Sequence, residues 1–354
     1  MKTILVTGGA GFVGSNLAIR LKRDLDDVRV VGLDNLRRRG SELSIPRLRE
    51  GGVEFVHGDI RNREDLDVSS RVDLILECSA EPSVLAGYGS SPEYVVQTNL
   101  AGTLTCLELA RRRGAGLIFL STSRVYPFSR INALRHTETD TRFVLDEEQD
   151  TPGVSSEGIA EGFSLEGSRS LYGATKLASE IILREYVDMY GLRAVVNRCG
   201  VIAGPWQMGK VDQGVVVLWV ARHIFGGPLR YIGFGGEGKQ VRDILSIEDL
   251  YRLVRLQIDD LGGLSGEVFN VGGGRENAVS LRELTELCQE ETGRRIEIGR
   301  EPETRPADIS VFVTDTKKVR GRTGWSPVDR PEKIVAEITA WIRNHGEILR
   351  PILC

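Results

Sequence analysis

The sequence has 354 residues, of which 41% are hydrophobic, and its 46 basic residues nearly balance 50 acidic ones. This composition excludes a disordered chain and gives no sign of a protein that binds nucleic acid or another polyanion. The length favours one large domain with a smaller one attached.

The N-terminal segment MKTILVTGGAGFVG has one lysine and an apolar run that glycines interrupt. The run is far shorter than the roughly 20 residues of a membrane span, so we expect a buried strand, no signal peptide and no membrane partner. Five scattered cysteines contain no C-x-x-C pair: Cys78, Cys106, Cys199, Cys288 and Cys354. Their number and spacing predict neither a disulfide framework nor a metal site, and they fit a reducing cytoplasm.

The first third of the chain alternates strand and helix patterns. Strands are expected at 2–7, 28–34, 53–59, 72–79 and 116–121, with helices at 11–23 and 92–114. This alternation predicts βαβ units around a parallel sheet covered on both faces, as in Rossmann-type doubly wound α/β folds.

From residue 127 to about 170 the periodicity fails, and we expect a long surface excursion with some local structure. A helix at 171–191 and a strand at 192–200 then extend the sheet, so the dinucleotide-binding domain should span 1–201.

The remainder, 202–354, is expected to form a smaller mixed α/β substrate-binding portion, with some chain crossing back to the first domain. Helices are predicted at 212–226, 246–261 and 280–293, and Ser280 begins an S-x-x-E capping box with Glu283.

A glycine-rich turn follows the first strand, with Gly8, Gly11 and Gly14 in TGGAGFVG. Such a turn lets backbone amides at a helix N-terminus approach a pyrophosphate. Asp34 ends the next strand, 20 residues after Gly14. Its carboxylate would accept hydrogen bonds from the adenosine ribose and repel a 2′-phosphate, which favours NAD over NADP.

Two features near this turn have alternative interpretations. The arginines at 37–39 would pair with a 2′-phosphate, although three in a row after a strand more often form a solvated loop. Asp59, after the third strand, would reach the adenine edge or cap the following turn.

Tyr172 and Lys176 lie four residues apart, so they share one face of a helix. The phenol of tyrosine has a pKa near 10, and a lysine ammonium one turn away would lower it toward that of a usable base. Thr122 stands at the C-terminal end of the fifth strand, where ligands of open α/β sheets bind.

The sequence resembles the extended short-chain dehydrogenase/reductase family of nucleotide-sugar epimerases and dehydratases. The resemblance lies in the order of four features: the glycine turn, the carboxylate Asp34, the hydroxyl of Thr122 and the Y-x-x-x-K motif. The resemblance covers nearly the whole chain and implies an NAD-dependent enzyme. Thr122 would hydrogen-bond the reacting hydroxyl, Tyr172 would be the acid/base, and Lys176 would hold the nicotinamide ribose. The implied cofactor contacts are Gly8, Gly11, Phe12, Val13, Asp34, Asn35, Asp59, Ile60, Ala80, Asn99, Tyr172 and Lys176.

The family members that dehydrate sugars carry an Asp-Glu pair directly after this threonine. Here those positions are Ser123 and Arg124, which cannot supply both the proton donor and the base for elimination. Dehydration is therefore disfavoured, and both residues are expected to contact the substrate.

Arg242, in GKQVRDIL, and Arg305, in RPAD, resemble the family's pyrophosphate-binding arginines. A surface salt bridge is the alternative for each. The segment around Asp212 and Gln213, and the 50-residue spacing between Thr122 and Tyr172, resemble the branch that inverts C2 of CDP-linked sugars. Gln213 is then expected to contact a CDP-hexose.

Other interpretations stay open at this point. A UDP-sugar 4-epimerase would need the same catalytic residues, and a non-catalytic NAD-binding scaffold is a more distant alternative. Glu81, in ECSAEPSV, is either a pocket carboxylate or, as we favour, a loop charge. The resemblance also implies a homodimer or homotetramer that pairs through helices at 98–113 and 172–190.

Overall fold

The computed structural model describes residues 1–209 and 213–354. The chain forms two compact units, each assembled from separate segments. Unit 1 comprises Met1–Val125, Ser170–Arg198 and Tyr251–Phe269, and unit 2 comprises Tyr126–Arg169, Cys199–Leu250 and Asn270–Cys354. The predicted division after residue 201 follows chain order, whereas these units exchange segments along the chain.

A seven-stranded sheet forms the centre of unit 1, in the order β14-β10-β5-β4-β1-β2-β3. The strands are β1 (Lys2–Thr7), β2 (Val28–Asp34), β3 (Glu54–His57), β4 (Leu74–Glu77), β5 (Gly116–Thr122), β10 (Ala194–Cys199) and β14 (Val268–Val271). From β3 to β5 the pairs are parallel. Every residue of β4, β5 and β10 is buried, as expected for strands covered on both faces. The predicted Rossmann-type doubly wound fold is confirmed.

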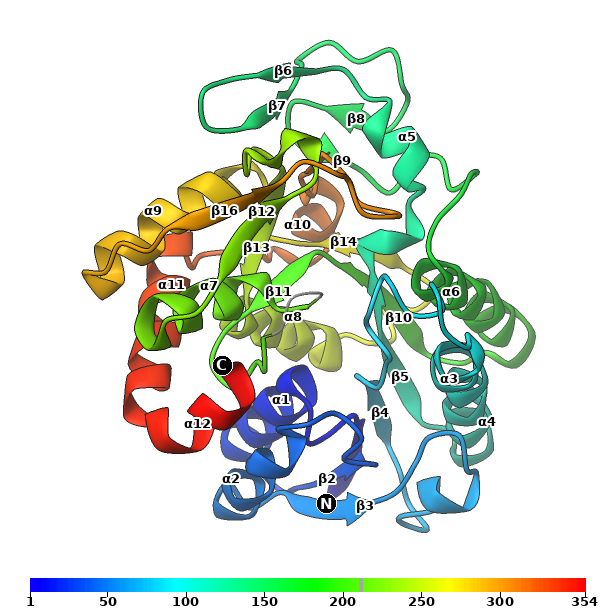
Figure 1. The fold of residues 1–354 in the computed structure, drawn as a ribbon. Coiled ribbons are helices and arrows are strands. Elements are labelled where there is room, and N and C mark those ends of the chain that lie inside the picture. Colours follow the sequence, from blue (N-terminus) through cyan, green and yellow to red (C-terminus); the bar gives the residue numbers. More distant parts are fainter. Residues whose placement is uncertain (210–212) are drawn as a thin grey trace. The chain divides into compact units, whose positions relative to one another are not determined.

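Helices cover this sheet. They are α1 (Phe12–Asp24), α2 (Ser44–Glu50), α3 (Glu93–Val96), α4 (Gly102–Arg113), α6 (Leu171–Tyr190) and α8 (Ile247–Asp259), with a π-helical turn at Gln97–Ala101 between α3 and α4. Figure 1 shows α3, α4 and α6 together beside β4 and β5, where α4 and α6 also contact each other. Short 3₁₀ turns lie at Ser41–Leu43, Glu64–Leu66 and Ser123–Val125.

Unit 2 contains several small sheets. A four-stranded sheet joins β11 (Val201–Ala203), β13 (Val241–Ser246), β15 (Ala278–Ser280) and β17 (Val311–Phe312), and β12 (Leu229–Ile232) pairs with β16 (Ile298–Glu301). The helices are α5 (Phe128–Asn132), α7 (Val215–Phe225), α9 (Leu281–Thr292), α10 (Lys317–Thr323), α11 (Pro331–Asn344) and α12 (Gly346–Leu353), and 3₁₀ turns lie at Phe234–Gly236 and Arg275–Asn277. The predicted capping box at the start of α9 is present.

The segment expected to run over the surface is partly core. It forms α5 and two hairpins, β6 (His136–Glu138) with β7 (Phe143–Leu145) and β8 (Val154–Ser155) with β9 (Gly158–Ile159). Its buried apolar side chains are Ile131, Leu134, Phe143, Leu145, Ile159 and Phe163. The expectation of a surface excursion is therefore wrong for these residues, because strands of two or three residues are too short to show a sequence period.

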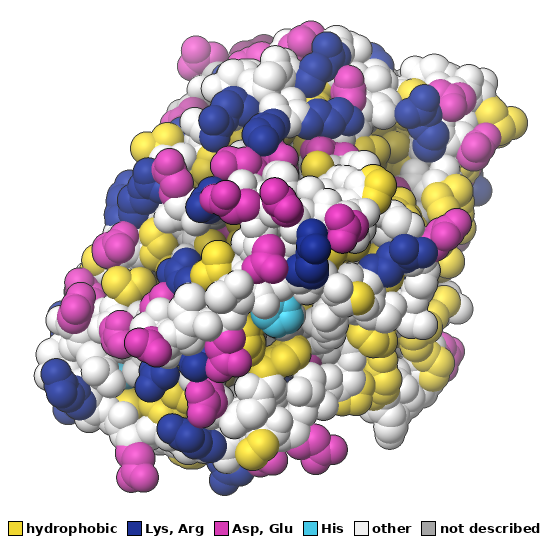
Figure 2. Space-filling view, turned by 90° about the horizontal axis from the view of Figure 1, so that it is seen from above, with side chains coloured by type: hydrophobic (Ala, Val, Ile, Leu, Met, Phe, Trp, Pro, Cys, Tyr) yellow, Lys and Arg dark blue, Asp and Glu magenta, His cyan; other side chains and the backbone are white. Residues whose placement is uncertain are grey.

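The surface carries charges of both signs. Figure 2 shows Lys and Arg side chains interspersed with Asp and Glu on the face that it draws, in keeping with the net charge of −4. Within residues 1–209 and 213–354, no helix is long and apolar enough to span a bilayer. The same residues contain no cluster of three or more His, Cys, Asp or Glu placed to hold a metal ion.

Candidate active site

The glycine turn between β1 and α1 is shaped by backbone contacts that only glycine permits. Gly8 has a positive φ of 65°, and a Cβ on it would lie 2.9 Å from the carbonyl oxygen of Cys78. A Cβ on Gly14 would lie 2.1 Å from the carbonyl oxygen of Gly8, so α1 packs directly on the turn. Gly11 caps α1, and Phe12 and Val13 form its first turn. Their amides lie where a helix N-terminus binds a pyrophosphate.

Asp34 ends β2 beside this turn. Its Oδ2 accepts from the amide of Ala10 at 3.1 Å, and its Oδ1 accepts from the amide of Leu36 at 2.8 Å. Burial raises the pKa of Asp34, while hydrogen bonds from backbone amides oppose the rise. Because a carboxylate has about four acceptor positions, the side chain can also accept from the hydroxyls of an adenosine ribose.

Asn35 and Asp59, two of the predicted cofactor contacts, lie next to each other. The Nδ2 of Asn35 donates to Oδ2 of Asp59 at 2.8 Å. Arg61 binds the same carboxylate with two donors, at 2.9 and 2.7 Å, and holds the pKa of Asp59 at about 2.

The guanidinium carbon of Arg37 lies 3.7 Å from the centre of the Tyr94 ring. Arg37 therefore stacks on an aromatic ring.

Asn99 links two parts of unit 1. Its Oδ1 accepts from the amide of Glu81 at 2.7 Å, and its Nδ2 donates to the carbonyl of Glu81 at 3.1 Å and to Oγ1 of Thr175 at 3.3 Å. It thus ties the loop after β4, which includes Ala80, to α6. The carboxylate of Glu81 accepts from the amide of Ser83, as in a local turn. These contacts suit a supporting role for Asn99.

Ile60 packs against α4. A Cβ on Gly102 would lie 2.4 Å from its Cδ1, and Ile60 is 4% exposed. Its side chain belongs to the apolar core.

Thr122 is the last residue of β5 and is 6% exposed. Its Oγ1 accepts from the amide of Arg124 at 3.1 Å, which fixes the hydroxyl at the start of the 3₁₀ turn Ser123–Val125. Helix α6 packs on both β5 and this turn. The helix that bears Tyr172 and Lys176 therefore lies against the strand end that bears Thr122.

Ser170 caps the N-terminus of α6, and its side chain accepts from the amide of Gly173 at 3.3 Å. This cap places Tyr172 in the first turn, half-buried, and Lys176 one turn later, 2% exposed. The Nζ of Lys176 lies 4.1 Å from the centre of the Phe119 ring, in β5. Tyrosine and lysine thus share a face, as the spacing predicted.

A buried ion pair fixes α6 and escaped the sequence reasoning. Arg198 in β10 contacts Glu180 with Nη2 at 2.7 Å and Nε at 3.0 Å, and both side chains are at most 7% exposed. The hydroxyl of Ser121, next to Thr122, donates to the same carboxylate. No local spacing signals this pair, because its two residues stand 18 positions apart and on different elements.

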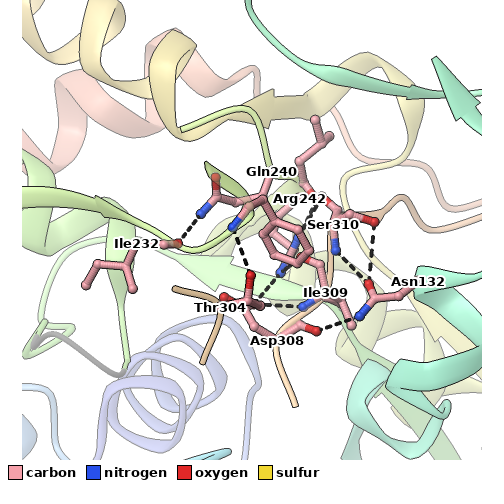
Figure 3. Close-up of polar contacts among 10 residues, drawn as sticks. Asn132, Ile232, Gln240, Arg242, Thr304, Asp308, Ile309 and Ser310 are labelled. Atoms are coloured by element: carbon pink, nitrogen blue, oxygen red, sulfur yellow. Dashed lines mark hydrogen bonds and ion pairs between the residues drawn. The ribbon is translucent and has the colours of Figure 1, made fainter. Parts of the chain in front are cut away.

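Arg242 lies in β13 of unit 2 and is engaged by its own chain (Figure 3). Its Nη2 donates to Oδ1 of Asp308 at 3.0 Å and to the carbonyl of Ile309 at 2.6 Å, and its Nη1 donates to the carbonyl of Val241 at 2.7 Å. Asn132 holds the same segment, because its Nδ2 donates to the carbonyl of Asp308 at 2.9 Å. Asp308 orients Arg242, a relation that sequence reasoning missed.

Of the other predicted substrate residues, Arg305 and Gln213 belong to unit 2, whereas Ser123 and Arg124 belong to unit 1. Arg305 is half-buried, and its carbonyl accepts from the amide of Asp308 at 3.2 Å. Gln213 is half-buried before α7. Asp212 lies outside the described residues.

Residues 4–272 match the model of the "NAD dependent epimerase/dehydratase family". The chain belongs to this family. Among curated proteins, a CDP-paratose 2-epimerase of Salmonella typhi is 31% identical over 96% of this chain and 98% of its own length. A dTDP-glucose 4,6-dehydratase of Neisseria meningitidis is 28% identical over 96% of this chain and 93% of its own. This chain is thus an enzyme of the NAD-dependent nucleotide-sugar epimerase/dehydratase type, and its cofactor is NAD.

A solved structure agrees with this family assignment. UDP-glucose 4-epimerase of Thermus thermophilus, in complex with NAD, has a TM-score of 0.77 and 26% identity, with coverage of 96% of this chain and 99% of that one. The glycine turn between β1 and α1 fits the pyrophosphate of NAD, and Asp34 fits its ribose, which supports the same cofactor here.

Proposed function

We propose that this enzyme inverts C2 of a nucleotide-diphosphate sugar, most consistently a CDP-linked hexose. The observation that carries the proposal is Thr122 at the end of β5, followed by Ser123 and Arg124. A hydroxyl and a guanidinium lack the donor and base that elimination of water needs. The similarity to a CDP-paratose 2-epimerase supports the choice of C2 and of CDP.

The proposed acid/base is Tyr172. As a phenolate it would take the proton of the C2 hydroxyl while the Oγ1 of Thr122 hydrogen-bonds that hydroxyl. Lys176 would lower the pKa of Tyr172 and hold the nicotinamide ribose. NAD, when bound, supplies the acceptor and later the donor of hydride. The 2-keto sugar would then turn its other face, and Tyr172 would return the proton.

Arg242 and Arg305 are proposed to bind the pyrophosphate of the substrate, and Gln213 the nucleotide sugar. Guanidinium groups suit phosphate oxygens. Arg242 would have to exchange a carbonyl partner for phosphate, with Asp308 keeping its orientation. We therefore expect Arg242→Lys to raise KM more than it lowers kcat, because a point charge cannot replace the planar fork.

The test is an NMR analysis of products from CDP-, UDP-, GDP- and dTDP-hexoses. The C2 epimer of a CDP-hexose is expected, with no solvent deuterium at the inverted carbon because hydride returns internally. C4 epimers of a UDP-sugar alone would instead assign the runner-up, a UDP-sugar 4-epimerase, and loss of water would reject epimerisation.

Tyr172→Phe tests the acid/base assignment. We expect kcat to fall by about 10²-fold or more while NAD stays bound, since the ring remains and only the hydroxyl is lost. Turnover at the parent rate would overturn the role of Tyr172.

A homodimer is the proposed assembly, paired through α4 and α6. Ile181 and Met189 on α6 are 59% and 67% exposed, which is unusual for large apolar side chains. Light scattering should give twice the mass of the chain, and Ile181→Lys with Met189→Lys should return it to the monomer mass.

A further inference from the structure

A row of three side chains crosses the centre of the unit 1 sheet. Thr7 of β1 is in register with Glu77 of β4, which is in register with Phe119 of β5. Residues in register on adjacent strands point to the same face of a sheet. All three are 0% exposed. A carboxyl group therefore stands in the core of the sheet, at the strand end nearest the candidate active site.

Within residues 1–209 and 213–354, the carboxyl of Glu77 has a single hydrogen bond. Its Oε1 accepts from Oγ1 of Thr103, in α4, at 2.6 Å. Its Oε2 is buried and has no hydrogen-bond partner among the residues that the structure describes. A buried ionised carboxylate is costly unless an opposite charge compensates for the lost water. Glu77 thus needs a partner charge or a proton.

Lys176 is the charged group that faces this carboxyl from α6. Its Nζ lies over the ring of Phe119, the register neighbour of Glu77, and the side chain is 2% exposed. Burial raises the pKa of Glu77, and the positive charge of Lys176 opposes that rise. From α4, the titratable neighbour is Cys106, whose thiol has a pKa well above its usual value because of burial. Cys106 therefore stays neutral.

We propose that Glu77 is the buried counter-ion that keeps Lys176 protonated, and so acts as a positioning residue for the Tyr172 base. The ammonium and the carboxylate are both buried, at 2% and 0% exposure, and each would replace part of the solvation that the other has lost. Lys176 can lower the pKa of Tyr172 only while it carries its proton. The inference rests on the proposed roles of Tyr172 and Lys176.

The first experiment compares Glu77→Gln with the parent enzyme. Glutamine keeps the shape and removes the charge, so Lys176 should lose its proton and Tyr172 should become harder to ionise. The acid limb of the kcat profile should move up by about one pH unit. The phenolate absorbance of NAD-loaded protein, after subtraction of the absorbance of Tyr172→Phe, gives the pKa of Tyr172 directly. This pKa should rise by the same amount. An unchanged or lower pKa of Tyr172 would overturn the proposal.

Thr103→Val is the matched control, because it removes the hydrogen bond to Glu77 and leaves the carboxyl. If Glu77 were merely structural, both variants would lower the thermal midpoint and neither would move the ionisation of Tyr172. We expect Thr103→Val to shift the acid limb by less than half as much as Glu77→Gln.

Infrared spectroscopy of a second variant, Lys176→Met, tests the proposal even if Glu77→Gln does not fold. In Lys176→Met the carboxyl has lost its counter-ion, so a protonated-carboxyl band should appear that the parent lacks. Absence of the new band, or its presence in the parent at neutral pH, would overturn the proposal. If Tyr172→Phe turned over normally, the proposed function would fail instead, whatever the charge state of Glu77.

Discussion

A methyl group on Gly14 would lie 2.1 Å from the carbonyl oxygen of Gly8, a contact that neither backbone can relieve by a side-chain movement. We expect Gly14→Ala to cost about 3 kcal/mol of stability and to weaken NAD binding, because α1 must move away from β1. Urea unfolding and cofactor titration measure the two effects. Gly262→Ala is the control, since a Cβ there has no neighbour within 4 Å, and equal losses in both variants would contradict the packing argument.

Asp59 makes a pH-dependent contribution to the free energy of unfolding, and a single substitution can isolate it. Arg61 holds its folded-state pKa at about 2, below the unfolded value near 4, so its stabilisation is present above pH 4 and is lost as the pH falls toward 2. Because Arg61 is 38% exposed, solvent screening limits the contribution to about 1 kcal/mol. Asp59→Asn should therefore be less stable than the parent at pH 7, and the difference should shrink as the pH falls from 4 through 2. A difference that stays constant across this range would disprove the linkage.

At the residue scale, the sequence could predict groups whose role depends on local order. Gly8 and Asp34 follow strands at fixed spacing, so their positions relative to the turn were predictable. Glu77 and Asp308 were not, because their significance depends on burial and on partners far away in sequence. Asp308 meets Arg242 across 66 residues.

At the scale of elements, α6 is held by the ion pair between Glu180 and Arg198. Glu180→Ala should cost about 3–5 kcal/mol, because the guanidinium of Arg198 stays buried without its carboxylate. The double variant Glu180→Leu with Arg198→Met should recover most of that loss in denaturant unfolding. A double variant as unstable as the single one would show that the carboxylate acts through packing alone.

The helices and central strands were the most predictable elements. Long apolar periods and a capping box located α6 and α9 to within a few residues. The hairpins of the 127–170 segment were missed, since their buried side chains, such as Phe143 and Leu145, alternate over only three residues.

At the scale of the whole molecule, NAD should stabilise the chain, whereas NADP should not. At 100 times its Kd, NAD would add about 2.7 kcal/mol, because it binds only the folded state. Asp34 would repel a 2′-phosphate, and Arg37 is stacked on Tyr94. Thermal shifts of cofactor-stripped protein should therefore be large for NAD and small for NADP. Asp34→Asn should reduce the difference between the thermal shifts with NAD and with NADP. Equal thermal shifts of the parent with both cofactors would refute the role of Asp34.

The alternation of strands and helices was sufficient to predict the fold class, but not which segments form each unit. Tyr251–Phe269 joins unit 1 after more than 50 residues of unit 2, and no local pattern marks that return. Such assembly depends on contacts distant in sequence, which periodicity does not report.

Because Tyr251–Phe269 rejoins unit 1 late in the chain, the unit 1 sheet is completed late in biosynthesis. The last strand of the unit 1 sheet, β14, pairs with β10 but is translated about 70 residues later. Until then the nascent chain exposes the backbone edge of β10, a strand whose residues are all buried in the folded protein, and such an edge can pair with other chains. A gene fragment ending at residue 201 would keep that edge permanently, so we expect it to aggregate, whereas one extended to 272 should remain dispersed longer.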